Sequence, residues 1–240
     1  MTEYLFQTDS YLKTFDAVVQ ALDDTAHSIL LDRTAFYPGG GGQPCDAGTI
    51  LWDGKEIGVD RVRKTPEGIW HNLAPAFPLP PVGSAITATI DWVRRLQLMR
   101  THTAMHILCG VVFRDYGALV TGGDMEPLRG RMDFEFETLT KDLVSVIEES
   151  VNQEVAADRP IRVQILPREE AFKIPDLIRT KINLLPPEIR HVRTVELAGL
   201  DLQADGGTHV ASTAAVGRIR VVDYKSKGKI NKRIYIELEA

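Results

Sequence analysis

The sequence predicts an α+β protein in which a small N-terminal β-barrel precedes an α+β domain with a mainly antiparallel sheet. In the first ninety residues, short apolar runs alternate with glycine and proline clusters, a pattern typical of strands and turns. Beyond residue 91, apolar residues recur at helical spacing in two segments, and strand-like runs surround the second segment. Because strands outnumber crossover helices, antiparallel pairing is favoured. We expect two domains, 1–90 and 91–240.

Each expected element has its own local signal. Strands are expected at 28–32, 48–52, 57–62 and 85–90, and the four prolines of segment 73–83 indicate an extended connector. A long helix is expected from Trp92 to the stop at Tyr116-Gly117, and a second helix over 141–157 with Thr140 as its N-cap. The strands of the second domain are expected at 130–137, 161–166, 192–197, 216–222 and 230–238.

Composition indicates a folded protein without membrane spans. The chain is 44% hydrophobic and 25% charged, close to the globular average. No stretch approaches the roughly 18 apolar residues of a membrane helix, and the N-terminus lacks the pattern of an export signal. Cys45 and Cys109 are too few for a disulfide framework. We therefore expect a cytoplasmic protein with no membrane partner.

A basic stretch near the C-terminus stands out from an acidic chain. The net charge is −5, which argues against a partner held by bulk electrostatics. Between residues 218 and 233, however, Asp223 is accompanied by seven basic residues: Arg218, Arg220, Lys225, Lys227, Lys229, Lys232 and Arg233. A hairpin with its turn at 225–229 is expected here. The lysines either protect a strand edge or contact nucleic-acid phosphates.

The motif RTHTAMH is the sharpest sign of a metal site. His102 and His106 are four residues apart and lie on one face of the predicted helix, so they can share one ion or be ordinary polar positions. His209 follows two glycines in ADGGTHV, and Asp205 precedes it by four residues. Three histidines with a carboxylate or an open water position are typical of catalytic zinc. Cys109 is about 10.5 Å of helical rise from His102, too far to share the ion, and is expected to be a packed thiol.

The segment FYPGGGGQP, 36–44, is a glycine-rich loop after a predicted strand. Such a loop lets a substrate approach backbone N–H groups closely, although a plain flexible turn would also explain the glycines. It lacks the Lys and Ser/Thr of a phosphate-binding P-loop and the GxGxxG spacing before a helix. No nucleotide cofactor is expected.

These motifs together resemble a known family. RTHTAMH, VTGGDMEPLRGRMDFE, DGGTHVAST and the lysine-rich final hairpin resemble the editing domain of alanyl-tRNA synthetases. The match is closer to the free-standing AlaX-type editing proteins, and LDRTAFYPGGGGQP and IDWVRR resemble their longer form, which has an N-terminal β-barrel. The resemblance covers essentially the whole chain.

The resemblance implies zinc-dependent hydrolysis, in trans, of mischarged tRNA(Ala), chiefly its seryl ester, with the glycyl ester left open. It implies one Zn²⁺ per chain, held by His102, His106 and His209. The family's common pattern is CGGTH, and Asp205 stands where that cysteine would be. Asp205 is then either a fourth ligand, since carboxylate oxygen binds zinc, or a residue that orients a ligand while water completes the coordination.

The resemblance also suggests roles around the metal. Thr121 is our candidate for recognising the serine hydroxyl, or else is an ordinary strand residue, and Gln43 is the second candidate. The glycine-rich loop is expected to close over the tRNA 3′ end. The expected catalytic residues are Thr121, Gln43 and Asp205; substrate contacts are expected from Gly39, Gly40, Gly41, Gly42 and Arg100, and tRNA contacts from Lys225, Lys227, Lys229, Lys232 and Arg233.

Two other functions remain open on sequence alone. The chain can be a non-catalytic tRNA- or RNA-binding module with a structural zinc ion. It can also edit a different ester, such as seryl-tRNA(Thr), because threonyl-tRNA synthetases carry a related editing domain. The glycine-rich loop favours the alanine branch through resemblance.

Overall fold

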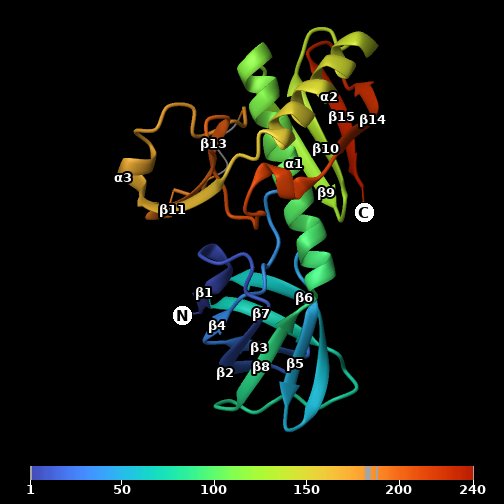
Figure 1. Ribbon diagram of the computed structural model, residues 1–240. Coiled ribbons are helices and arrows are strands. Elements are labelled where there is room, and N and C mark those ends of the chain that lie inside the picture. The colour runs from blue at the N-terminus through green and yellow to red at the C-terminus, as the bar shows by residue number, and fades with distance from the viewer. Residues whose placement is uncertain (1, 182–184, 188, 240) are drawn as a thin grey trace. The chain divides into compact units, whose positions relative to one another are not determined.

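The computed structural model describes residues 2–181, 185–187 and 189–239 (Figure 1). Contacts divide the chain into two compact units, Met1–Gln97 and Leu98–Ala240. Within the described residues, none of the helices is both long and apolar enough to span a membrane.

The first unit is built on a closed antiparallel barrel, which confirms the small N-terminal barrel predicted from the sequence. The strand order is β2-β3-β7-β6-β5-β8, closed between β8 and β2. The barrel strands are β2 (Thr14–Asp23), β3 (Ser28–Leu31), β5 (Gly48–Trp52), β6 (Lys55–Thr65), β7 (Gly68–Leu73) and β8 (Ala85–Ile90). Two short strands outside the barrel, β1 (Glu3–Tyr4) and β4 (Arg33–Thr34), pair in parallel. The 3-10 helix η1 (Leu5–Gln7) follows β1.

Alternating side chains fill the barrel. Ile29, Ile50, Ile57 and Ile69 are fully buried, as period-2 alternation requires of the inward face. Glycine is needed at Gly48, where an added Cβ would lie 2.1 Å from the backbone oxygen of Thr89 on β8. The close approach of β5 and β8 therefore depends on a residue without a side chain.

A 25-residue helix, α1 (Trp92–Tyr116), follows β8 directly. Asp91 caps its first turn by accepting a hydrogen bond from the Arg94 N–H, 3.1 Å away. At its other end Gly117 adopts a φ of 64° and donates to the Phe113 carbonyl, a usual left-handed stop. The helix thus has the bounds that its apolar periodicity predicted.

The second unit contains two antiparallel sheets, β14-β15-β10-β9 and β11-β12-β13. Met105 of α1 packs against Gly123 and Gly130 of the first sheet, and Gly110 faces Leu200 beside the second, so α1 runs between them (Figure 1). The strands are β9 (Val120–Glu126), β10 (Arg129–Glu135), β11 (Ile161–Pro167), β12 (His191–Leu197), β13 (Asp201–Ala204), β14 (Ile219–Ser226) and β15 (Asn231–Leu238).

The remaining helices are α2 (Lys141–Ala156), α3 (Arg168–Ala171) and the 3-10 helix η2 (Thr213–Val216). Thr140 caps α2 as predicted, accepting from the Leu143 N–H at 3.2 Å. The strand predicted at 216–222 begins three residues later, because Val216 ends η2 and Gly217 turns the chain with a φ of 75°. The unit is α+β with mainly antiparallel sheets, as the sequence predicted.

A candidate metal centre

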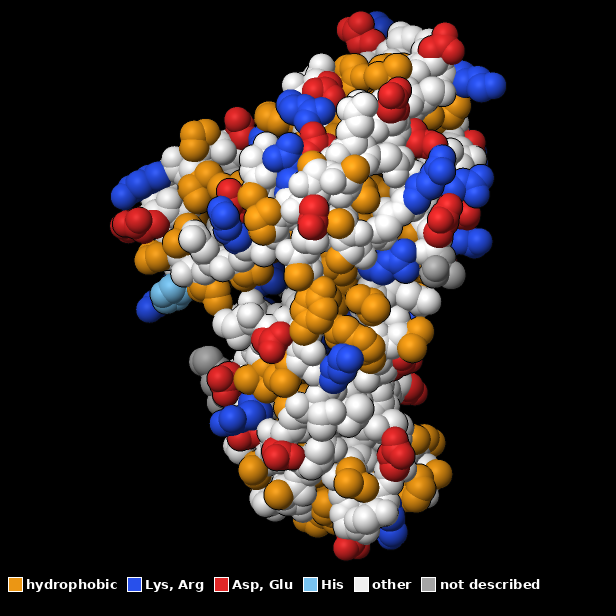
Figure 2. Space-filling model, in the orientation of Figure 1, with side chains coloured by type: hydrophobic (Ala, Val, Ile, Leu, Met, Phe, Trp, Pro, Cys, Tyr) orange, Lys and Arg blue, Asp and Glu red, His pale blue; other side chains and the backbone are white. Residues whose placement is uncertain are grey.

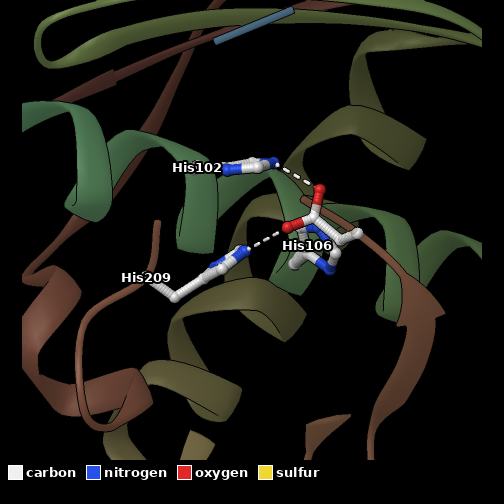
Figure 3. Close-up of side chains that lie close together, drawn as sticks. His102, His106 and His209 are labelled. Carbon is white, nitrogen blue, oxygen red and sulfur yellow. Dashed lines mark hydrogen bonds and ion pairs between the residues drawn. The ribbon is translucent and has the colours of Figure 1, made fainter. Parts of the chain in front are cut away.

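Four side chains converge in the second unit: His102, His106, Asp205 and His209, hereafter the His/Asp cluster. The two helical histidines lie one turn apart on α1, and the other two residues follow β13 in the loop that leads to η2. One ligand atom from each of the four lies within 4.8 Å of the others (Figure 3). The three imidazoles are buried, with ring centroids 4.3 to 5.1 Å apart.

The loop after β13 is held by its own hydrogen bonds. The Asp205 N–H donates to the Arg193 carbonyl at 3.1 Å, and Nη1 of Arg193 donates to the Asp205 carbonyl at 3.0 Å. Oδ2 of Asp205 accepts from the Gly207 N–H at 2.8 Å, closing a tight turn. Neither Gly206 nor Gly207 adopts a positive φ. The turn that brings His209 inward is thus fixed by Asp205 rather than by left-handed glycines.

Further polar groups orient the imidazoles from behind. Nδ1 of His106 lies 3.1 Å from Oδ2 of Asp201, and Nδ1 of His209 lies 3.1 Å from the Thr103 hydroxyl. Asp201 also accepts from Arg179 and Gln203, at 3.3 and 2.6 Å. A carboxylate that accepts from Nδ1–H of an imidazole leaves the lone pair on Nε2. His106 therefore presents Nε2 as its acceptor.

The protonation states follow from burial and from these partners. Burial lowers the pKa of His102 well below its usual value and that of His209 to about 4, so both rings are neutral at pH 7. Burial also opposes charge on His106, but the hydrogen bond to Asp201 and the negative charges of Asp205 and Asp201 together outweigh it and raise the pKa of that ring. Burial opposes charge on Asp205, yet the surrounding imidazoles hold the pKa of its carboxyl well below the usual range.

This donor set fits a divalent transition metal. Ligand atoms about 2.0–2.2 Å from a tetrahedral zinc ion stand roughly 3.4 Å from one another. In the His/Asp cluster, Nε2 of His209 lies 3.0 Å from Oδ2 of Asp205, and Nε2 of His102 lies 3.5 Å from Oδ1. Neutral imidazoles and an ionised carboxylate are the forms that bind metal. The residues present can therefore hold one ion.

Cys109 lies next to this cluster as a buried thiol, in agreement with the sequence-based exclusion of this residue as a ligand. Its Sγ accepts from Nε2 of Gln203 at 3.3 Å, and burial raises the pKa of the thiol. The metal-binding group among the described residues does not include it.

Comparisons with known proteins place the chain in a family. Residues 192–235 match the family described as the threonyl and alanyl tRNA synthetase second additional domain, and residues 6–94 match class II (A) tRNA synthetases. The alanyl-tRNA editing protein AlaX-M of Saccharolobus solfataricus is 39% identical, with 98% of each chain covered. The protein of the same name from Methanosarcina acetivorans is 35% identical, with 99% of each chain covered.

The chain belongs to the AlaX-M family of alanyl-tRNA editing proteins. It is also 34% identical to the alanine–tRNA ligase of Pyrococcus furiosus over 92% of its own length, which is 24% of that longer protein. The family resemblance predicted from the motifs is therefore confirmed.

The other predicted site residues of this AlaX-M family member have contacts of their own. Thr121 is exposed on β9, and its hydroxyl donates to Oδ1 of Asn231 on β15 at 3.0 Å. Arg100 donates from Nε to the Val216 carbonyl and from Nη2 to the Glu239 carbonyl, at 3.0 and 2.6 Å. These bonds tie the C-terminal end of the chain to α1, so Arg100 has a structural role that its motif did not reveal.

The glycine-rich loop lies in the first unit. Gly39, Gly40, Gly41 and Gly42 have φ values of 86°, 131°, 58° and 89°, which L side chains rarely adopt, so four glycines in succession are required here. Gln43 is buried, and its backbone exchanges two hydrogen bonds with Gly40. Closure of this loop over the tRNA 3′ end stays a prediction.

The basic hairpin is partly neutralised by carboxylates of its own sheet. Arg233 forms two hydrogen bonds with Asp133, at 2.6 and 2.8 Å, and Lys225 lies 2.9 Å from Asp223. Lys232 is buried and donates to the carbonyls of Gly228 and Lys229, which closes the turn. Acidic and basic side chains are correspondingly interleaved over β14 and β15 in Figure 2.

Lys227 and Lys229 remain exposed at the hairpin turn. Of the five lysines and arginines predicted to contact tRNA, these two are exposed and form no ion pair within 4 Å among the described residues, although the charge of Lys227 helps to lower the pKa of Asp133. Contact between these residues and tRNA stays a prediction.

Three residues that orient the cluster were not predicted from the sequence: Asp201, Thr103 and Arg193. Asp201 lies four residues before Asp205, so a repeated Asp-x-x-x-Asp spacing was the available signal. Thr103 lies inside RTHTAMH, next to His102. Arg193 gives no local signal, because its contact with Asp205 arises from the pairing of β12 with β13.

Proposed function

We propose that this chain hydrolyses the ester of mischarged tRNA(Ala), chiefly the seryl ester, at a Zn²⁺ ion held by His102, His106 and His209. The proposal is supported most directly by the His/Asp cluster, whose ligand atoms lie within 4.8 Å of one another in a member of an editing family. Hydrolysis consumes one water, breaks the ester bond, and releases serine and a tRNA with a free terminal hydroxyl.

Zinc bound there would supply Lewis acidity, either by acidifying a water or by fixing the aminoacyl group for attack. The surrounding residues keep the donors ready for this role. Asp201 holds the His106 ring in the form with a free Nε2, and Thr103 contacts Nδ1 of His209 from behind. Asp205 acts either as the fourth ligand or as the group that orients His209.

Selectivity for serine is assigned to a hydrogen bond with its hydroxyl. A polar group that binds this hydroxyl is left without its partner when alanine enters, which penalises the correct product. We propose Thr121 for this role, with Gln43 as the second candidate and Gly39–Gly42 as substrate contacts. Lys227 and Lys229 are the phosphate contacts best supported by their exposure.

The threonine branch remains the second candidate substrate. The family description that matches residues 192–235 names both threonyl- and alanyl-tRNA synthetases. Seryl-tRNA(Thr) is therefore the comparison substrate that separates the two branches. A non-catalytic tRNA-binding module would bind tRNA and zinc but hydrolyse none of these esters.

The decisive experiment measures deacylation by zinc-loaded and metal-stripped protein. The substrates are tRNA(Ala) charged with serine, glycine or alanine, and tRNA(Thr) charged with serine. We expect zinc-dependent loss of serine from tRNA(Ala) and an intact alanyl ester. His209→Ala should lose bound zinc and deacylation together, whereas His191→Ala, which changes an exposed histidine of the same unit, should retain both. Full zinc occupancy in His209→Ala would refute the assigned ligand set.

A further inference from the structure

The glycine-rich loop is closed at its base by a buried ion pair from the first turn of α1. Arg95 and Asp46 have exposed fractions of 0% and 1%, and both oxygens of Asp46 accept from the Arg95 guanidinium. A fully buried ion pair requires good geometry and further hydrogen bonds to offset the loss of hydration. The two residues have such bonds, and these bonds converge on the loop.

Arg95 joins three separate segments of the first unit. Besides Asp46, its guanidinium donates to the Ala35 carbonyl at 2.5 Å and to the Ser10 carbonyl at 2.9 Å. Ala35 lies just before the loop and Asp46 just after it. The neighbouring Arg94 donates to the Cys45 carbonyl at 3.2 Å. Arg94 and Arg95 thus bind the chain on both sides of the loop.

Asp46 completes the closure from the other side. Its Oδ2 accepts from the Tyr37 N–H at 2.6 Å, and its own N–H donates to the Tyr37 carbonyl at 3.0 Å. Within the loop, the Tyr37 hydroxyl donates to the Gly40 carbonyl at 3.0 Å. The two ends of the loop are therefore joined to each other, and Tyr37 also bonds to Gly40 inside the loop.

The tip of the loop is open where its base is crowded. A Cβ on Gly39 would lie 3.2 Å from the Cys45 nitrogen, whereas a Cβ on Gly41 would meet no atom within 4 Å. Space for a ligand thus exists at the tip. A preorganised loop binds without the entropy loss of ordering a mobile one.

We propose that Arg95 and Asp46 are positioning residues, which hold the glycine-rich loop in the shape that receives the aminoacylated end of tRNA. This inference rests on the substrate role given to the loop under the proposed function. The ligand is a polar aminoacyl ester, which the exposed glycines at the tip, Gly40 and Gly41, can approach without obstruction by side chains. The shape of the loop is thus set before the substrate binds, so that any closure over the tRNA 3′ end would move the loop as a preformed unit.

The test combines a structural and a kinetic readout on the full-length, zinc-loaded protein. Arg95→Lys keeps the charge but loses the planar fork that reaches all three segments. Tyr37→Phe removes only the hydroxyl that bonds Gly40, and serves where Arg95→Lys does not fold. Arg63→Lys is the control, because Arg63 forms a partly exposed ion pair with Asp23 in the same barrel.

Hydrogen exchange of residues 37–46 is measured beside kcat and KM for seryl-tRNA(Ala). We expect faster exchange in this loop alone, a loss of about tenfold to a hundredfold in kcat/KM, and unchanged zinc per chain. Arg63→Lys should change neither the loop exchange nor kcat/KM.

Unchanged hydrogen exchange of the loop in both Arg95→Lys and Tyr37→Phe would show that these contacts do not hold the loop. Faster loop exchange with wild-type kcat/KM would show that the shape of the loop plays no part in the reaction. A wild-type protein without deacylase activity would instead refute the proposed function. Hydrogen exchange would still decide whether Arg95 holds the loop.

Discussion

Oδ2 of Asp201 lies 3.1 Å from Nδ1 of His106. Asp201 is itself buried and accepts further hydrogen bonds from Arg179 and Gln203. These bonds prevent the carboxylate from rotating away. The carboxylate therefore fixes which nitrogen of His106 is available to a metal.

Replacing this carboxylate should weaken metal binding without removing any ligand. In Asp201→Asn the charge behind His106 is lost, and we expect metal affinity to fall about 10- to 100-fold. Competition titration with a chelator of known affinity measures this change. Asp115→Asn, at the partly exposed end of α1, is the control. Wild-type affinity in Asp201→Asn would show that His106 needs no such partner.

Thr121→Val tests the assignment of selectivity. Valine keeps the shape of the side chain but removes the hydroxyl that bonds Asn231. We therefore expect a clear fall in kcat/KM for seryl-tRNA(Ala) hydrolysis with a smaller effect on folding stability. The measurement compares kcat/KM with the thermal midpoint. Thr87→Val removes a similar strand hydroxyl, which bonds Asp16 in the barrel, and should leave kcat/KM unchanged. If Thr121→Val keeps wild-type rates and selectivity, Thr121 is not part of the pocket.

Charge reversal should affect tRNA binding at two lysines of the hairpin turn and hairpin stability at a third. Changing Lys227 and Lys229 to Glu should weaken tRNA binding and reduce the salt slope of log K by about 2 units, because two phosphate contacts are lost. Changing Lys232 instead should destabilise the hairpin, since its ammonium bonds two carbonyls of the turn. Filter binding across a salt series separates the loss of phosphate contacts, which reduces the salt slope, from destabilisation of the hairpin, which does not. An unaltered slope in the double variant would exclude the turn from the interface.

His71 should make the barrel sensitive to acid. Burial lowers the pKa of His71 to about 4, whereas an unfolded histidine titrates near 6.5. The unfolded chain therefore takes up the proton first, and stability present above pH 6.5 is lost as the pH falls toward 4, by roughly 3 kcal/mol in all. Thermal melts of wild type and His71→Gln across this range give the difference. Parallel curves for the two proteins would contradict the assignment, and His191→Gln serves as the exposed control.

Local periodicity predicted most of the fold. The α1 helix and strands β5 and β8 have the bounds expected from their apolar spacing. β2 was not predicted, because a bulge between Val19 and Ala21 interrupts its alternation. β9 was not predicted either, since VTGGDME has two glycines and becomes a strand only through its pairing with β10. Such strands are specified by their neighbours, which a local pattern does not contain.

In the candidate site, too, residues close in sequence were predicted and contacts between distant residues were not. His102 and His106 are neighbours on a helix and Asp205 and His209 are four residues apart, so short spacings identified all four. The partner of Arg233 in the basic hairpin was not predictable, because Asp133 is a hundred residues away in the chain. A run of charges shows how many cations a segment has, but only the sheet register shows which carboxylates neutralise them.

The cluster of imidazoles and a carboxylate contains no sulfur donor. Oxidants attack thiolates, and the nearby Cys109 is buried and held as a thiol, which makes it a poor target. Peroxide or a thiol-alkylating reagent therefore finds no ligand to modify. The metal-binding capacity of this chain should survive oxidative stress that would inactivate a site built on cysteine.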